Sequence, residues 1–181
     1  GAKVAGKYVG GLSEFGVFSF DFGKMITTGE GGALFSKKKS DGKNARMYHD
    51  HGHKNIPNLP RGLDRAGLIG FNYRMTEISG AFGKVQLKKF PIILRDSKKR
   101  YHALEDCIDH KDIKFRSVNS GSEPNYDTFV ISIENKKLRN QVIRLLNKAG
   151  FGTKNLPDAF NWHCAYFWEH IDEKIRNKEV R

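Results

Sequence analysis

The sequence has few cysteines and no long apolar run, and both absences narrow the kind of protein it encodes. Cys107 and Cys164 are the two cysteines among 181 residues, and they stand far apart, in no spacing typical of a metal or redox site. We therefore expect free thiols in a reducing compartment and a cytoplasmic protein. No apolar run approaches the length that spans a bilayer, and no charged-then-apolar segment of the secretory kind opens the chain.

Acidic residues are scarce relative to basic ones, 20 against 32, which gives a net charge of +12. Such an excess is typical of a protein with an anionic partner, whether nucleic acid, lipid or a small phosphorylated or carboxylated molecule. The basic residues form small scattered groups, such as Lys37–Lys39 and Lys98–Arg100, without interleaved aromatic residues. We expect neither nucleic acid nor a membrane as partner. A small anionic ligand stays open, as does a basic, non-enzymatic binding module.

The composition, 38% hydrophobic and 12% aromatic, is typical of a globular protein. The length suffices for one domain, with part of a second, and for a hydrophobic core. The chain opens on Gly1 without an initiator methionine and ends in a charged run. We therefore expect a piece of a longer protein.

Two strands and a helix are predicted in the first part of the chain. Apolar alternation predicts strands at 13–21 and 32–36, and a start signal at Ser40 precedes a helix over 40–49. Residues 50–69 combine glycine, proline, asparagine and charge, which predicts a long loop. Loops of that length in compact domains are usually functional or mobile.

A long helix and a smaller α+β unit are predicted next. Thr76 begins a helix whose apolar residues keep helical spacing as far as Ile108, and Pro91 should kink or restart it. The elements predicted after it are strands at 111–115 and 128–133 and a helix at 137–149, ended by Gly150. The apolar residues expected on one buried face of that last helix are Leu138, Val142, Leu145, Leu146 and Ala149.

One lysine stands at the end of an aromatic strand. Residues 18–24 read Phe-Ser-Phe-Asp-Phe-Gly-Lys, and the glycine-rich turn Thr27–Gly32 follows. Burial disfavours the charged form of an ammonium group, and a neutral lysine can attack a carbonyl and hold it as a Schiff base. The turn has neither the dinucleotide-binding spacing nor the Walker spacing, which argues against a nucleotide hydrolase. On spacing alone, an ordinary hairpin with a solvent-reaching Lys24 is the simpler interpretation.

A second polar segment, Gly70–Glu77, places Asn72 and Arg74 just before a predicted helix. Backbone N–H groups and the helix dipole favour anions at such a position. Taken alone, the segment could equally be a capping sequence.

Histidines give weaker signals. His49, His51 and His53 alternate and could bind a metal on one face of a strand, but no cysteine or carboxylate set completes the site, so we expect no metal. A polar and aromatic group near the C-terminus could line a pocket or lie on a surface helix; its members are Asp158, Trp162, His163 and His170.

The lysine motif, the asparagine motif and their order resemble the DegT/DnrJ/EryC1/StrS family of sugar aminotransferases. The segments that carry the resemblance are Ser19–Lys24, Thr27–Gly32, Gly70–Glu77 and Gln86–Lys89, and it extends over residues 7–105. It implies an α/β fold of the aspartate-aminotransferase type (fold type I), with pyridoxal 5′-phosphate (PLP) as cofactor. Residues 1–93 would be the C-terminal part of the large cofactor domain, and 94–181 an incomplete small α+β domain.

The resemblance also implies roles for single residues. Lys24 would bind the cofactor aldehyde and then move the proton between the substrate Cα and the cofactor, as general base and then acid. Ser19 would bind the cofactor phosphate. Asn72 would reach the phosphate in the neighbouring subunit, so that a homodimer shares its active sites. Arg74 and His163 are candidates for substrate binding.

One part of the family's cofactor site has no counterpart in this chain. The acidic partner of the pyridine nitrogen and the residue that stacks on the ring would lie upstream of Gly1, and Asp21 belongs to the lysine motif itself. Without that acidic partner the cofactor is a poor electron sink. We therefore expect this chain to hold part of an active site.

The resemblance implies the transfer of an amino group to a nucleotide-linked keto-sugar, with glutamate as the expected donor. The product would be used in the biosynthesis of a surface polysaccharide or lipopolysaccharide. Lys24 argues against the dehydratase branch of the family, which has histidine there. The segments 152–159, 161–163 and 50–53 are similar to the branch that aminates an 8-oxo-Kdo-type sugar acid, which is the alternative substrate.

Overall fold

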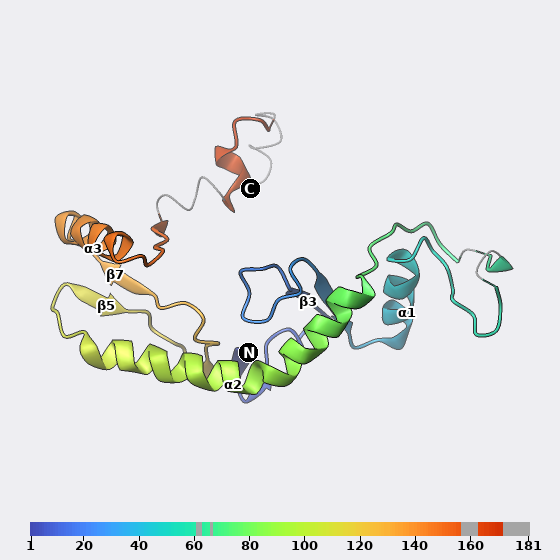
Figure 1. The fold of residues 1–181 in the computed structure, drawn as a ribbon, viewed down its shortest axis with the longest axis horizontal. Helices are drawn as coiled ribbons and strands as arrows, with labels where there is room; N and C mark the ends of the chain where they lie inside the picture. The colour runs from blue at the N-terminus through green and yellow to red at the C-terminus, as the bar shows by residue number, and fades with distance from the viewer. Residues whose placement is uncertain (61–62, 66, 157–162, 172–181) are drawn as a thin grey trace. The chain divides into compact units, whose positions relative to one another are not determined.

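The computed structural model describes residues 1–60, 63–65, 67–156 and 163–171 (Figure 1). The chain divides into two compact units. The first is Gly1–Asp109 with Phe115–Ile131, and the second is His110–Lys114 with Ser132–Arg181. The boundary expected after residue 93 falls inside a continuous helix of the first unit. The division of the whole protein into domains stays a prediction.

An antiparallel hairpin carries the glycine-rich turn. It consists of β3 (Phe15–Ser19) and β4 (Gly32–Ser36), whose register joins Phe15 to Ser36 and Ser19 to Gly32. The two predicted strands are therefore confirmed, the first in a shorter form. The hairpin stands alone among the described strands, and Val17 on it is 79% exposed. Residues 20–31 leave directly from its last pair, so the position of the turn is fixed by strand pairing.

A small sheet joins the start of the first unit to a much later segment. It has the order β2-β1-β6, from β1 (Lys3–Val4), β2 (Lys7–Tyr8) and β6 (Ser122–Glu123), and all its pairs are antiparallel. One side-chain hydrogen bond reaches this sheet from residue 98: Lys98 Nζ donates to Glu123 Oε1 of β6 at 2.8 Å. This bond lowers the pKa of Glu123 and raises that of Lys98.

Helix α1 (Lys39–Tyr48) confirms the helix predicted at 40–49, although not its start signal. The N-cap is Lys38, and its side chain makes no capping hydrogen bond. Ser40 therefore lies within the first turn, together with Asp41, whose charge suits the positive end of the helix dipole.

Helix α2 (Glu77–Cys107) runs for 31 residues. It begins as predicted, because Thr76 is its N-cap and accepts a 3.1 Å hydrogen bond from the Ser79 N–H. The helix continues through Pro91, and Figure 1 shows it bending near the middle of its length. A proline removes one backbone donor and crowds the preceding turn, which accounts for a bend rather than a break.

The remaining elements are short. Strands β5 (Ile113–Phe115) and β7 (Ile131–Ile133) form a two-stranded sheet, and α3 (Lys136–Lys148) follows. Asn135 caps α3 by accepting from the N–H groups of its first turn, and Gly150 follows the helix with φ +83°. The predicted strands, helix and glycine stop are confirmed. A 3₁₀ turn, η2 (Ala165–Phe167), lies further along the chain.

The described residues bury few of the apolar side chains that the expected hydrophobic core would contain. Among the described residues, the buried hydrophobic side chains are Met47, Tyr101 and Ile133. Helix α3 buries none of its described residues, and Leu145 on its predicted apolar face is 59% exposed. Because apolar burial is the main favourable term in folding, this much exposed apolar surface indicates elements that need further cover.

Two further expectations can be checked on the fold. Cys107 and Cys164 are both free, as expected. Among the described residues, no helix has the length and apolar character that crossing a bilayer requires.

Candidate functional site

The turn that carries Lys24 is closed by hydrogen bonds to one residue. The Phe20 N–H donates to the Gly31 carbonyl (2.9 Å), and the Phe20 carbonyl accepts from the Thr28 N–H (2.9 Å) and from Thr27 Oγ1 (3.1 Å). Both backbone groups of Phe20, the N–H and the carbonyl, are hydrogen-bonded to the far end of the turn. Residues 21–27 therefore form a separate loop with Lys24 in its middle. The loop therefore has a fixed base, and its middle carries the primary amine of Lys24.

Lys24 is paired with an aspartate of the same loop. Its Nζ lies 3.4 Å from Asp21 Oδ2, and its side chain is 51% exposed. The Lys24 N–H also donates to the Asp21 carbonyl (3.1 Å), so the backbone holds the two residues one turn apart. The described structure therefore has a solvent-exposed Lys24, as in the simpler of the two interpretations of its motif, and not the buried ammonium group of the other. The physical reason is that no other described strand covers the hairpin from which the loop leaves.

Asp21 is held in its charged form. The Gly23 N–H donates to Asp21 Oδ1 at 2.6 Å, and this bond is the main reason that the pKa of Asp21 lies below its ordinary value. Hydrogen bonds and charge from Lys24 lower it further, as does Ser19. Asp21 is therefore an anion at neutral pH and attracts the ammonium group beside it.

Ser19 is the last residue of β3 and stands at the base of the same loop. Its Oγ accepts a long hydrogen bond, 3.4 Å, from the Asp21 N–H. Because the oxygen acts as acceptor there, the hydroxyl proton can be donated to another oxygen. A phosphate oxygen is a suitable acceptor for it.

The lysine turn packs closely against the start of α2. A Cβ atom on Gly31 would lie 2.7 Å from Thr28 Oγ1 and 2.8 Å from Met75 Cε. A Cβ on Gly83 would lie 2.7 Å from Thr28 Cγ2. Glycine at both positions therefore allows this close approach. The structure thus brings the lysine motif next to the segment that follows Asn72.

Asn72 and Arg74 are tied to the loop after α1. Asn72 forms an isolated antiparallel bridge with Asp50, and its Oδ1 accepts from the Arg74 N–H at 3.4 Å. Arg74 Nη1 donates to Asp50 Oδ1 at 2.5 Å. Arg74 therefore forms an ion pair with a buried carboxylate. The sequence did not indicate this partner.

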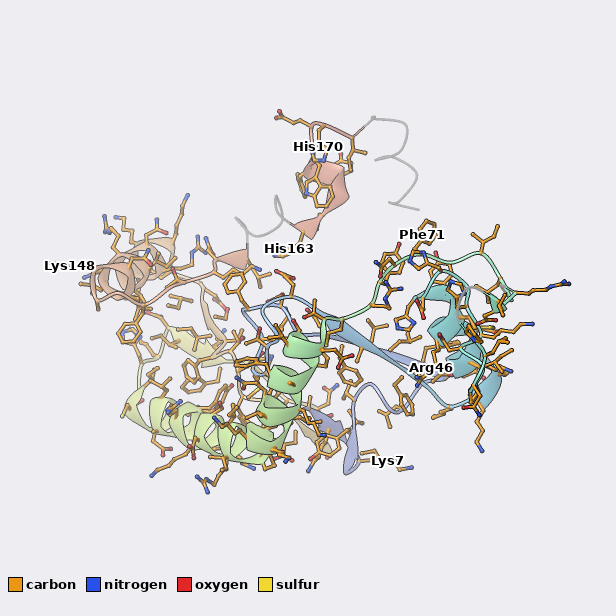
Figure 2. The ribbon with its side chains drawn as sticks, turned by 45° about the vertical axis from the view of Figure 1, so that its right-hand side comes forward. Lys7, Arg46, Phe71, Lys148, His163 and His170 are labelled. Atoms are coloured by element: carbon orange, nitrogen blue, oxygen red, sulfur yellow. The ribbon has the colours of Figure 1, made fainter. Side chains whose placement is uncertain are left out.

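His163 belongs to the second unit, whereas the other candidate residues belong to the first. Its Nε2 lies 2.5 Å from Lys154 Nζ. His170 stacks on Trp168 with ring centroids 5.7 Å apart, and Figure 2 shows both histidines on the segment that carries η2. Asp158 and Trp162, expected beside them, lie outside the described residues.

The alternating histidines do not share a strand face. His49 Nδ1 lies 2.5 Å from the Arg46 carbonyl, and His51 has φ +56°, which lies outside the range of a regular strand. Within the described ranges, no group of three or more histidine, cysteine or acidic residues could hold a metal ion.

Sequence reasoning missed the polar network around these histidines. Asp50 and Asp64 are both buried, and Asn55 bridges them: its Nδ2 donates to Asp50 Oδ2 (2.9 Å) and its N–H to Asp64 Oδ2 (2.8 Å). Acidic residues inside a loop rich in glycine and asparagine were a signal for such a network, but the loop has no periodicity that would have paired them.

Comparisons with known proteins give the family and the fold of the chain. The model of the DegT/DnrJ/EryC1/StrS aminotransferase family matches residues 1–174. GDP-perosamine synthase of Escherichia coli O157:H7 is 34% identical over 97 residues, which cover 49% of this chain and 23% of that protein.

Solved structures show the same fold. The aminotransferase TlmJ from Streptoalloteichus hindustanus superposes with a TM-score of 0.71 at 19% identity, over 99% of this chain and 48% of that one. Escherichia coli GDP-4-keto-6-deoxy-D-mannose-3-dehydratase with bound hydrated PLP gives a TM-score of 0.66 at 27% identity, over 83% and 42%. The predicted fold type is confirmed. The chain spans less than half the length of each of these three proteins.

Proposed function

Because the chain belongs to the DegT/DnrJ/EryC1/StrS aminotransferase family, we propose that the whole protein transfers an amino group from an amino acid, glutamate in the first instance, to a keto-sugar. The observation that carries the proposal is the closed loop 21–27, which holds the amine of Lys24 in an accessible position. The relative named GDP-perosamine synthase supports a nucleotide-linked sugar as substrate. A relative from Salmonella typhimurium named lipopolysaccharide biosynthesis protein RfbH supports a surface polysaccharide or lipopolysaccharide as destination.

The groups on the hairpin fit PLP as cofactor. Lys24 offers a primary amine that can bind an aldehyde covalently. Ser19 offers a hydroxyl proton to the phosphate from the base of the same loop. When bound, PLP supplies the electron sink that stabilises negative charge on the substrate carbon. An acidic partner for the ring nitrogen is not offered by Asp21, because that carboxylate faces Lys24.

Lys24 is proposed to move the proton at the substrate Cα. An amine within hydrogen-bonding reach of that carbon can take the proton as a general base and return it as a general acid. Asp21 is proposed to orient Lys24 before substrate arrives, because it pairs with Nζ and its backbone fixes the same turn.

Asn72 is proposed to bind the cofactor phosphate of a neighbouring subunit in a homodimer. Its Oδ1 faces the Arg74 backbone, and among the described residues no acceptor takes a hydrogen bond from its Nδ2. An exposed amide with free N–H groups is suited to a phosphate supplied by another chain. A shared site would make dimerisation necessary for activity.

Arg74 and His163 stay candidates for binding the substrate. Arg74 keeps N–H groups beyond the one that it donates to Asp50, and His163 lies beside Lys154, so each could face an anionic sugar group. A primary amine at position 24 favours amino transfer over the chemistry of the dehydratase relative, because an imidazole cannot hold an aldehyde as a Schiff base.

The test is amino transfer by the full-length protein. Purified protein with PLP is given ¹⁵N-glutamate and a nucleotide-linked 4-keto-sugar, with an 8-oxo sugar acid in a parallel reaction, and the product is examined for ¹⁵N by mass spectrometry. Lys24→Ala should abolish transfer. Lys38→Ala is the matched control, because Lys38 is an exposed lysine near the same hairpin, paired with Glu14. Label in the sugar acid alone would favour the alternative substrate. Protein that binds no PLP and labels neither would contradict the proposal and favour a basic binding module.

A further inference from the structure

Asp50 occupies the centre of a polar network, and the proposed chemistry gives this residue no role. It is 6% exposed, yet it receives the guanidinium of Arg74 at Oδ1 and the amide of Asn55 at Oδ2. A buried carboxylate is costly unless it is paired and hydrogen-bonded, so a network of this kind has a definite geometry.

The same residue meets Asn72 through the backbone. Asp50 and Asn72 form an antiparallel bridge, and three hydrogen bonds flank it. They run from Phe71 N–H to Tyr48 C=O (2.8 Å), from His51 N–H to Phe71 C=O (2.9 Å) and from Tyr73 N–H to His49 C=O (2.9 Å). Segments 48–51 and 71–73 therefore lie side by side as one short ladder.

Aromatic rings cover this ladder. Tyr48 packs edge-on against Phe71 with ring centroids 5.6 Å apart, and it lies 6.2 Å from Tyr73. Phe71 and Tyr73 are 5.7 Å apart. Figure 2 shows Phe71 on the segment that runs beside the end of α1. Contacts between the rings hold segments 48–51 and 71–73 together. The ion pair between Asp50 and Arg74 is a second side-chain link between the same parts of the chain.

Asn55 extends the network to a second buried carboxylate. It has φ +51°, a conformation that asparagine tolerates better than most residues, and from there it donates to both Asp50 and Asp64. Asp64 Oδ2 also lies 3.9 Å from His53 Nδ1. The loop is therefore anchored at several points and is not a freely moving connection in this region.

We propose that Asp50 is a positioning residue: through its pair with Arg74 and its bridge to Asn72, it holds the Asn72 amide in the place from which it binds the cofactor phosphate. This inference rests on the proposed function, because it assigns Asp50 to the same site. It also gives Arg74 a role in positioning. A guanidinium that is paired with a buried carboxylate orders the backbone around Asn72, and a lysine in its place would lose the planar fork.

The test is a double-mutant cycle in the full-length protein, with the dissociation constant of PLP as the readout. If Asp50 acts through Asn72, Asp50→Asn weakens PLP binding roughly tenfold, the middle of the range of coupling between residues in contact. The same change has little further effect in an Asn72→Ala background. Arg74→Lys, which keeps the charge, should weaken PLP binding in the same direction. Glu14→Gln is the matched control, because it removes one charge from an exposed pair with Lys38.

The possible outcomes separate the two proposals. If wild-type protein binds no PLP, the proposed function fails. If wild type binds PLP and Asn72→Ala weakens it, but Asp50→Asn does not, the positioning role is overturned and the function stands. Equal effects of Asp50→Asn in both backgrounds also overturn it, because they indicate general destabilisation. So does an Arg74→Lys variant that raises only the KM for the sugar, which would make Arg74 a substrate ligand. Circular dichroism verifies that each variant is folded.

Discussion

The methyl group of Thr28 occupies the space that a side chain at Gly83 would need. A Cβ atom at Gly83 would lie 2.7 Å from Thr28 Cγ2, well inside van der Waals contact. The turn that follows Lys24 thus rests on the second turn of α2, and the helix begins only a few residues after Asn72. The lysine motif and the asparagine motif are therefore both positioned by the start of α2.

This contact makes a prediction for two glycines of one helix. Gly80→Ala meets no atom within 4 Å, so it should raise the free energy of unfolding by up to about 1 kcal/mol, because alanine is the better helix former. Gly83→Ala gains the same propensity but must displace Thr28. We expect it to be less stable than Gly80→Ala and to bind PLP more weakly than wild type. Urea unfolding and PLP titration measure the two effects, and identical behaviour of the two variants would contradict the contact.

Asp21 in the lysine loop predicts that the free energy of unfolding depends on pH. The pKa of Asp21 is lowered, first by the Gly23 N–H and then by Lys24, so the unfolded chain binds a proton there more readily than the folded chain. The stabilisation is therefore complete above the ordinary value of 3.8 and is lost as pH falls through the lower folded value. NMR titration of the Asp21 carboxyl should show this lowered midpoint.

Asp21→Asn supplies the comparison for that titration. The variant should lose the part of the acid dependence of stability that Asp21 contributes, so its unfolding free energy falls less steeply below pH 4. A wild-type midpoint at or above the ordinary value would show that the loop does not hold Asp21 as described.

Tyr101 is the aromatic anchor of α2. It is 5% exposed and packs edge-on against Phe129 (4.9 Å between centroids) and Tyr126 (5.3 Å). Tyr101→Ala should cost about 3–5 kcal/mol in urea unfolding, the usual range for removing a large buried aromatic side chain. Leu104→Ala, one turn further along and partly exposed, should cost much less. Similar losses in both variants would mean that the cluster does not anchor the helix.

The features predicted from the sequence are those that depend on near neighbours. The hairpin around Lys24, the Thr76 cap and the Gly150 stop all follow from residues within a few positions of one another, and the structure confirms them. The family motifs, also local, led to the fold that the solved structures share.

The features that were missed depend on residues far apart in the chain. Val4 pairs with Ser122, and strands of two residues have no periodicity to recognise. Asp50 and Arg74 are joined across a loop of irregular sequence. The sequence left open whether Lys24 is buried or exposed for a related reason: whether a strand end is buried depends on neighbouring strands, and a local pattern of aromatic residues does not specify them.

The central claim is that Lys24 holds the cofactor, and borohydride trapping tests it most directly. Full-length protein is incubated with PLP, reduced with borohydride and digested, and the mass of the peptide that contains Lys24 is measured, with Lys24→Ala and Lys38→Ala treated alike. We expect a reduced pyridoxyl-phosphate adduct on Lys24 in wild type and in Lys38→Ala, and none in Lys24→Ala. An adduct on another lysine with Lys24 unmodified, or no adduct in wild type, would contradict it.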